Sequence, residues 1–142
     1  MSPIQMMLWS LTLPALGLLA WKGRGVERCS AAAILLVVLA PFLAQDIEVG
    51  NVRWVVGLTS AGLAAVLLTQ ALLWDRWWLL AAAGIQGAAA ATYGLAALQP
   101  DIMIWTGVVL RRIFWIELML VVLFGAWEAQ QVARYRLEEA KT

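Results

Sequence analysis

Long apolar stretches separated by short polar ones make up this chain. A transmembrane helix takes about 20 apolar residues, each rising about 1.5 Å. Candidate spans of this kind cover residues 4–21, 29–45, 54–74, 77–98 and 113–127. Because only Asp75 and Arg76 separate the third stretch from the fourth, these two predict a tight antiparallel helical hairpin. The pattern predicts an all-α fold: a polytopic integral membrane bundle of about five transmembrane helices, forming one domain over 1–142.

Residues 102–112 fit this pattern less simply, since Arg111 and Arg112 interrupt their apolar run. Two charges in the middle of a bilayer are expensive. We favour a short interfacial segment that places both arginines at the level of the lipid headgroups. The alternative is an extension of the last helix, whose arginines would then face a protein partner or an aqueous pocket. Residues 128–142 are polar and predict a cytoplasmic tail.

Basic residues in short loops set the orientation of a membrane protein, because they stay on the cytoplasmic side. With the N-terminus outside, seven basic residues fall inside and three outside. The inner set is Lys22, Arg24, Arg28, Arg76, Arg134, Arg136 and Lys141, and the outer set is Arg53, Arg111 and Arg112. We therefore expect an N-out, C-in topology, in a bacterial cytoplasmic (inner) membrane.

Tryptophans mark the ends of the predicted helices. Six of the nine fall there: Trp21, Trp54, Trp74, Trp77, Trp78 and Trp127. Tryptophan has an amphipathic ring that is most stable at the membrane–water interface. We interpret these six as interfacial anchors, and a tryptophan-lined ligand pocket is the alternative. Trp9, Trp105 and Trp115 fit the interfacial pattern less well.

The composition supports a membrane protein and narrows its chemistry. Apolar residues make up 63% of the 142 residues and charged residues 13%, against about 45–50% and about 25% in soluble domains. The chain has no His, which removes the usual general base and the commonest zinc or haem ligand. Its one Cys, Cys29, allows no internal disulfide, and ten basic against nine acidic residues give no field that would attract nucleic acid. We expect neither catalysis nor a metal site.

Small residues form stripes on two of the predicted helices. Their spacing of three or four residues lets another backbone approach closely, and this packing drives helix association in lipid. The stripes are Gly57, Ala61 and Ala65 in the third span and Gly84, Gly87, Ala91 and Gly94 in the fourth. Our first interpretation is that the stripes pack against each other within one subunit. The functional alternative is a groove for another subunit, a lipid or an isoprenoid tail.

A few polar side chains lie inside the apolar stretches. Gln86 and Tyr93 lie seven residues apart in the fourth span, and Gln70 lies near the end of the third. Buried polar side chains in a bilayer usually bond to a neighbouring helix. We expect interhelical hydrogen bonds first and the lining of a polar path second.

Glu117 lies within the last apolar stretch, and an intramembrane carboxylate is a candidate functional site by default. Three roles are open for this carboxylate. In the first it forms an ion pair with Arg111, Arg112 or Arg53 that holds the bundle together, and its role is structural. The other two roles are contact with a basic or hydroxyl group of another subunit, and the coupling of protons or cations. Arg111 and Arg112 are alternatively sites for anionic headgroups.

These features favour a non-catalytic accessory subunit of a larger membrane complex, such as a photosynthetic or respiratory energy-converting assembly. Its partners would be membrane lipids and other membrane subunits, and its bound molecules a lipid, a quinone or a carotenoid. The alternative is a small homo-oligomeric transporter or channel that uses Glu117. An energy-converting host is an analogy with other small helical subunits, since the fold does not fix the function.

Overall fold

The computed structural model describes residues 3–43, 54–99 and 104–142, and within these ranges every regular element is an α-helix. The helices are α1 (Pro3–Lys22), α2 (Gly25–Leu43), α3 (Trp54–Trp74), α4 (Trp77–Leu98) and α5 (Ile104–Glu139). The predicted all-α class is thereby confirmed. Three helices, α1, α3 and α4, are long and apolar enough to cross a membrane.

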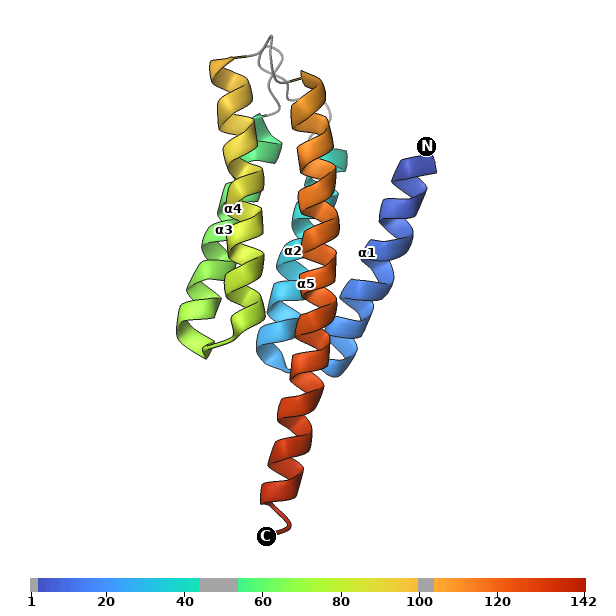
Figure 1. Cartoon of the computed structure of the whole chain (residues 1–142), viewed down its shortest axis with the longest axis vertical. Helices are drawn as coiled ribbons and strands as arrows, with labels where there is room; N and C mark the ends of the chain where they lie inside the picture. The colour runs from blue at the N-terminus through green and yellow to red at the C-terminus, as the bar shows by residue number, and fades with distance from the viewer. Residues whose placement is uncertain (1–2, 44–53, 100–103) are drawn as a thin grey trace.

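The helices run up and down beside one another in an elongated bundle (Figure 1). Helices α3 and α4 lie side by side as the predicted hairpin, α5 packs against α4 and α1, and α2 packs against α1 and α3. Helix α1 leans away from the other helices toward its N-terminus. The short α1–α2 and α3–α4 turns lie at the same end of the bundle (Figure 1).

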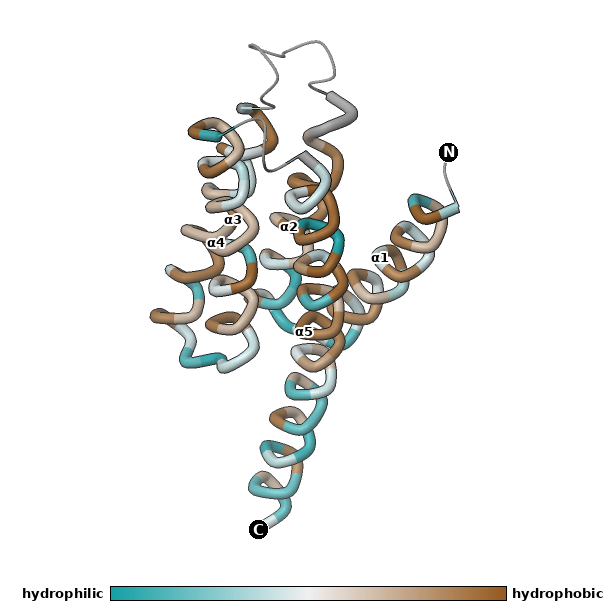
Figure 2. The backbone as a smooth tube through the Cα atoms, turned by 45° about the horizontal axis from the view of Figure 1, so that its top comes forward, coloured by the Kyte–Doolittle hydropathy of each residue, from teal (hydrophilic) through white to brown (hydrophobic). Residues whose placement is uncertain are grey.

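Helix α5 settles how residues 104–112 are built. The helix runs without a break through Arg111 and Arg112 to Glu139, so these residues extend the last helix. The prediction of a separate short segment is therefore wrong for residues 104–112. Residues 102 and 103 lie outside the described ranges. With 36 residues the helix is about 54 Å long, which exceeds the roughly 30 Å of a hydrocarbon core. Its hydrophilic C-terminal part projects beyond the other helices (Figure 2).

Apolar side chains from all five helices form one core. Its fully buried members include Leu19, Ile34, Leu67, Leu79, Leu118, Met119 and Val122. The largest buried side chain is Trp78 of α4, which packs over Gly125 of α5. A Cβ atom at Gly125 would lie 2.5 Å from Trp78 Cδ2, so only glycine lets the two helices approach this closely around the indole.

The outer surface of the bundle is also apolar. Large hydrophobic side chains are exposed on every helix, among them Leu13, Leu36, Leu58, Leu72, Leu98, Val109 and Leu120. In water such a surface would drive aggregation, whereas in lipid it costs nothing because the acyl chains are equally apolar. The fold therefore suits a hydrocarbon environment on its sides.

A buried ion-pair cluster ties three elements together at the end that holds the short turns. Arg76, between α3 and α4, lies 3.5 Å from Glu27 of α2 (Nη2 to Oε1) and 3.8 Å from Glu128 of α5 (Nη1 to Oε1). The Glu27 side chain is only 1% exposed. One arginine thus lies between the buried carboxylate of Glu27 and the half-buried carboxylate of Glu128.

Glu27 also explains why α2 begins at Gly25, four residues before the predicted start at 29. Its Oε2 accepts a hydrogen bond of 3.0 Å from the backbone N–H of Arg24. This is the second half of a capping box, in which a glutamate at the third helical position satisfies the N–H of the N-cap residue. The charged residues Glu27 and Arg28 therefore belong to the first turn of the helix.

Replacing Gly125 by alanine tests the packing of α5 on Trp78. We expect Gly125→Ala to lower the free energy of unfolding by about 1–3 kcal/mol, the usual cost of overpacking. The matched control is Gly84→Ala, since a Cβ there meets nothing within 4 Å and alanine favours the helix by about 0.5–1 kcal/mol. Unfolding by SDS, followed by circular dichroism in detergent, measures both. Equal stability of the two variants would contradict the contact.

Replacing Arg76 by methionine tests the ion-pair cluster. Because this change leaves the buried carboxylate of Glu27 without a counter-charge, we expect a loss of about 3–5 kcal/mol in the same unfolding experiment. Arg24→Met is the control, because Arg24 is exposed at the same end of the bundle. Adding Glu27→Gln to Arg76→Met should recover part of the loss. If Arg24→Met costs as much as Arg76→Met, the cluster is not what holds this end.

Candidate functional site

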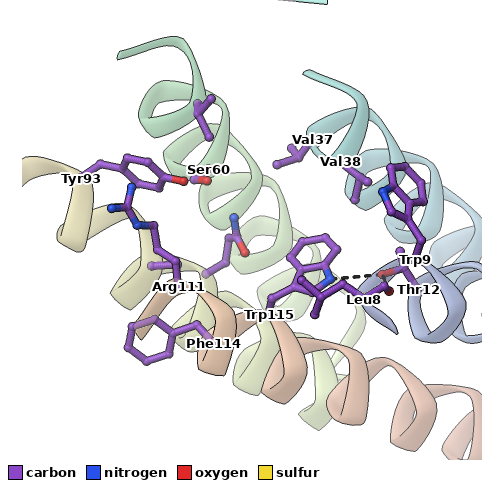
Figure 3. A pocket seen from close by; sticks show the side chains of 13 residues that line it. Leu8, Trp9, Thr12, Val37, Val38, Ser60, Tyr93, Arg111, Phe114 and Trp115 are labelled. Atoms are coloured by element: carbon purple, nitrogen blue, oxygen red, sulfur yellow. Dashed lines mark hydrogen bonds between the residues drawn. The ribbon is translucent and has the colours of Figure 1, made fainter. Parts of the chain in front are cut away.

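A partly open cavity of about 280 Å³ lies between the helices, and all five of them contribute to its wall (Figure 3). The lining residues are Leu8, Trp9 and Thr12 of α1, Val37 and Val38 of α2, Val56 and Ser60 of α3, Gln86, Ala89 and Tyr93 of α4, and Arg111, Phe114 and Trp115 of α5. Aromatic and aliphatic side chains make most of the wall, with a small number of polar groups among them. This mixture is typical of small-molecule sites.

The one charged side chain in this lining is Arg111, and it is held in place from two sides. Its guanidinium carbon lies 4.5 Å from the centre of the Tyr93 ring, a cation–π contact between α5 and α4. Its Nε donates a hydrogen bond of 2.8 Å to the backbone carbonyl of Gly107. Figure 3 shows the guanidinium beside the tyrosine ring. Arg111 Nη1 and Nη2 remain as donors.

Two glycines make room for this pair. A Cβ at Gly57 of α3 would lie 3.1 Å from Tyr93 Cβ, and one at Gly107 would lie 3.0 Å from Arg111 Nη2. Both distances are tighter than ordinary side-chain contacts, so a larger residue at either position would displace the tyrosine or the arginine. The backbone therefore helps to fix where the positive charge lies.

On the α1 side of the cavity, a hydrogen bond joins α1 to α5. Trp115 Nε1 donates to Thr12 Oγ1 at 3.1 Å (Figure 3), and the Thr12 hydroxyl donates to the Leu8 carbonyl at 2.7 Å. Thr12 is 1% exposed. The threonine thus satisfies a buried indole N–H and fixes the plane of the Trp115 ring.

Two further polar side chains in the wall have no partner. Gln86 of α4 is 4% exposed and Ser60 of α3 is 5% exposed. Neither forms a hydrogen bond with another of the described residues, although buried polar groups are nearly always satisfied. The cavity therefore presents an amide and a hydroxyl that are free to bind a guest.

The structure divides the five predicted intramembrane polar residues into two groups. Gln86, Tyr93 and Arg111 lie together in the cavity wall. Arg112 and Glu117 are exposed on the outside of α5. Glu117 forms no ion pair with Arg111 or Arg112, so that interpretation is wrong for these two partners; Arg53 lies outside the described residues. Gln70 does form an interhelical bond, since its Oε1 is in hydrogen-bond contact with the Ser30 hydroxyl of α2.

The small-residue stripes do not pack against each other as we expected. Helices α3 and α4 are in contact, but the stripe residues Ala61, Ala65, Gly84, Ala91 and Gly94 are exposed and Gly87 is half-buried. A Cβ at Gly84, Gly87 or Gly94 would meet nothing within 4 Å. Gly57 is the member that packs within the chain, against Tyr93. The rest of the α4 stripe leaves an open outer surface.

Five of the six predicted anchors are exposed at helix ends or in the outer face of α5. Trp21, Trp54, Trp74, Trp77 and Trp127 have exposures between 47% and 82%, which fits a ring in contact with lipid. Trp78 is the exception, since it is 1% exposed. It belongs to the core and not to the surface, because the gap at Gly125 admits its ring.

Sequence reasoning missed most of the cavity wall. Trp9 and Trp115 were noted as poor matches to the interfacial pattern, and this misfit was the one available signal. No sequence pattern singles out Thr12, Ser60 or Glu27. Packing decides which side of an evenly apolar helix faces the core, and the order of residues along the helix does not show it.

The described residues contain no group of three His, Cys, Asp or Glu side chains placed to hold a metal ion. No protein-family model, curated protein or solved structure matches the chain. The geometry of the cavity and of the outer surface therefore carries the functional argument alone.

Replacing Thr12 by valine tests the α1–α5 contact at the cavity. Loss of the acceptor for Trp115 Nε1 should lower the free energy of unfolding by about 0.6–2 kcal/mol. The control is Thr69→Val, since Thr69 is exposed and bonds only to the Ala65 carbonyl of its own helix. An equal effect of the two changes in SDS unfolding would mean that the bond contributes nothing between the helices.

Proposed function

We propose that this chain is a non-catalytic subunit of a larger membrane complex, and that all five helices cross the bilayer. The observation that carries the proposal is the position of Glu117. It lies eleven residues before Glu128 along α5, which is about 16 Å along the helix axis. Since α3 has 21 residues and is about 31 Å long, Glu117 is close to half-way along the bundle.

At that depth an exposed carboxylate faces acyl chains unless another protein covers it. Glu117 has no partner among the described residues, and a charged side chain at the bilayer centre costs about 2.5–3.5 kcal/mol or more. A basic or hydroxyl side chain of a neighbouring subunit would remove this cost. Glu117 is therefore proposed to be a contact residue.

The surroundings of Glu117 support a neighbouring helix. Exposed residues of α5 recur at steps of four and three residues: Ile113, Glu117, Leu120, Phe124 and Trp127. Such a stripe is the seam along which two helices pack. Beside it an apolar groove between α4 and α5 is lined by Trp77, Ala81, Leu120 and Phe124. The open glycine face of α4 would let a partner helix approach closely.

The transporter alternative receives less support. A transport path within one chain would need its ionisable group to face that path, whereas Glu117 is exposed on the outside of α5 and does not line the cavity. A transport path between copies of the chain would place Glu117 at the interface of a homo-oligomer. Native mass spectrometry distinguishes such a homo-oligomer from a complex with a different subunit. An N-out, C-in orientation in a bacterial inner membrane is part of the proposal, and so is an energy-converting host complex.

The test is purification of the tagged chain from its native membrane in a mild detergent, with native mass spectrometry of the product. We expect a different membrane subunit in fixed stoichiometry, and at least a fivefold loss of it with Glu117→Leu. Glu138→Leu is the control, because it removes the same charge from the exposed C-terminal part of α5. Recovery of copies of this chain alone would favour the transporter alternative, and full retention of the partner by Glu117→Leu would refute the contact.

A further inference from the structure

The partly open cavity between the five helices has the features of a ligand site whose guest is negatively charged. Arg111 is the charged residue in its wall, and the other lining residues include no Asp or Glu. A half-buried charged group is stabilised by a nearby opposite charge. Tyr93 and the Gly107 carbonyl orient the guanidinium, and no Asp or Glu among the described residues forms an ion pair with it. The missing counter-charge is what a ligand would supply.

Hydrogen-bond donors converge on the same cavity. Besides Arg111 these are the hydroxyl of Ser60 and the amide of Gln86, both at least nine-tenths buried and without a hydrogen-bond partner in the part of the chain that the structure describes. In Figure 3 the side chains of Ser60, Tyr93 and Arg111 lie together at one side of the cavity. An anionic head group accepts from all of these donors, and charge-assisted bonds of this kind are about twice as strong as neutral ones.

The rest of the wall suits an apolar tail. Trp9, Trp115, Val37 and Val38 are on the other side of the cavity, away from Tyr93 (Figure 3). The volume of about 280 Å³ is just below that of most ligand pockets, which hold about 300–1,000 Å³. One hydrocarbon chain fits this space better than the two chains of a membrane phospholipid.

We propose that the cavity binds a single-chain amphiphile with an anionic head group, a carboxylate or a phosphate. The head group lies at Arg111, with hydrogen bonds from Gln86 and Ser60, and the chain extends between Trp9 and Trp115. The site lies between the helices, away from the outer contact surface around Glu117. It therefore goes beyond the proposed subunit function and does not depend on it.

Tryptophan quenching by a brominated ligand tests this proposal on the purified full chain in detergent. We expect 12-bromododecanoate to quench part of the fluorescence in a saturable way, because its bromine would lie near Trp9 and Trp115. Arg111→Gln should weaken this binding at least tenfold. The matched control is Arg112→Gln, since Arg112 is the exposed neighbour on the same helix, and it should change the affinity less than twofold.

Competition against the wild-type protein keeps the test independent of how the variants fold. Unbrominated dodecanoate should relieve the quenching, whereas dodecanol, which has the same chain without the charge, should need at least ten times the concentration. Dodecyl phosphate in the same assay distinguishes a phosphate from a carboxylate preference. Non-saturable quenching, equal competition by dodecanol, or equal loss in Arg111→Gln and Arg112→Gln would each overturn the proposal.

Discussion

The apolar outer surface is the constraint on which the rest of the structure depends. Leucines are exposed on all five helices, and tryptophans on four of them, and a helical bundle with such sides is stable only where the solvent is hydrocarbon. Helices suit that solvent because each satisfies its own backbone N–H and C=O groups. Since lipid gives no hydrophobic force between helices, close fits such as Trp78 over Gly125 and a few polar contacts must hold the helices together.

Polar groups occur in three parts of the bundle, and each group has a different role. At the end that holds the short turns, Arg76 joins Glu27 and Glu128 and fixes α2 and α5 to the α3–α4 hairpin. Between the helices, Arg111, Gln86 and Ser60 line a cavity, and all three keep hydrogen-bonding capacity that no other described residue uses. On the outer face, Glu117 is exposed and has no partner within residues 3–43, 54–99 and 104–142. The first set stabilises the fold, whereas the other two leave polar groups that a ligand or a neighbour would satisfy.

The sequence predicted where the helices lie along the chain, but not which side of each helix faces the core. The ends of α3 and α4 agree with residues 54–74 and 77–98 because tryptophans and charges bound those apolar stretches. Which residues turn inward was not predictable, because in these helices apolar residues occupy all sides and no amphipathic stripe marks the core. For that reason the sequence alone points to Trp78 as an anchor and to the α4 glycines as an internal contact, and it gives no sign of the part that Glu27 plays. Gln86, Tyr93 and Arg111 were found because a polar residue in an apolar stretch stands out by itself.

The most direct test of the account is the side of the membrane on which each end of the bundle lies. Single cysteines at Lys22, Gln99 and Thr142, all exposed, can be introduced with Cys29→Ser and labelled with a membrane-impermeant maleimide in sealed vesicles of known orientation. If α5 crosses the bilayer with Glu117 near its centre, Gln99 reacts from the outside, and Lys22 and Thr142 react only from the cytoplasmic side. Labelling of Gln99 and Thr142 from the same side would contradict the crossing, and with it the depth of Glu117 on which the proposed subunit contact rests.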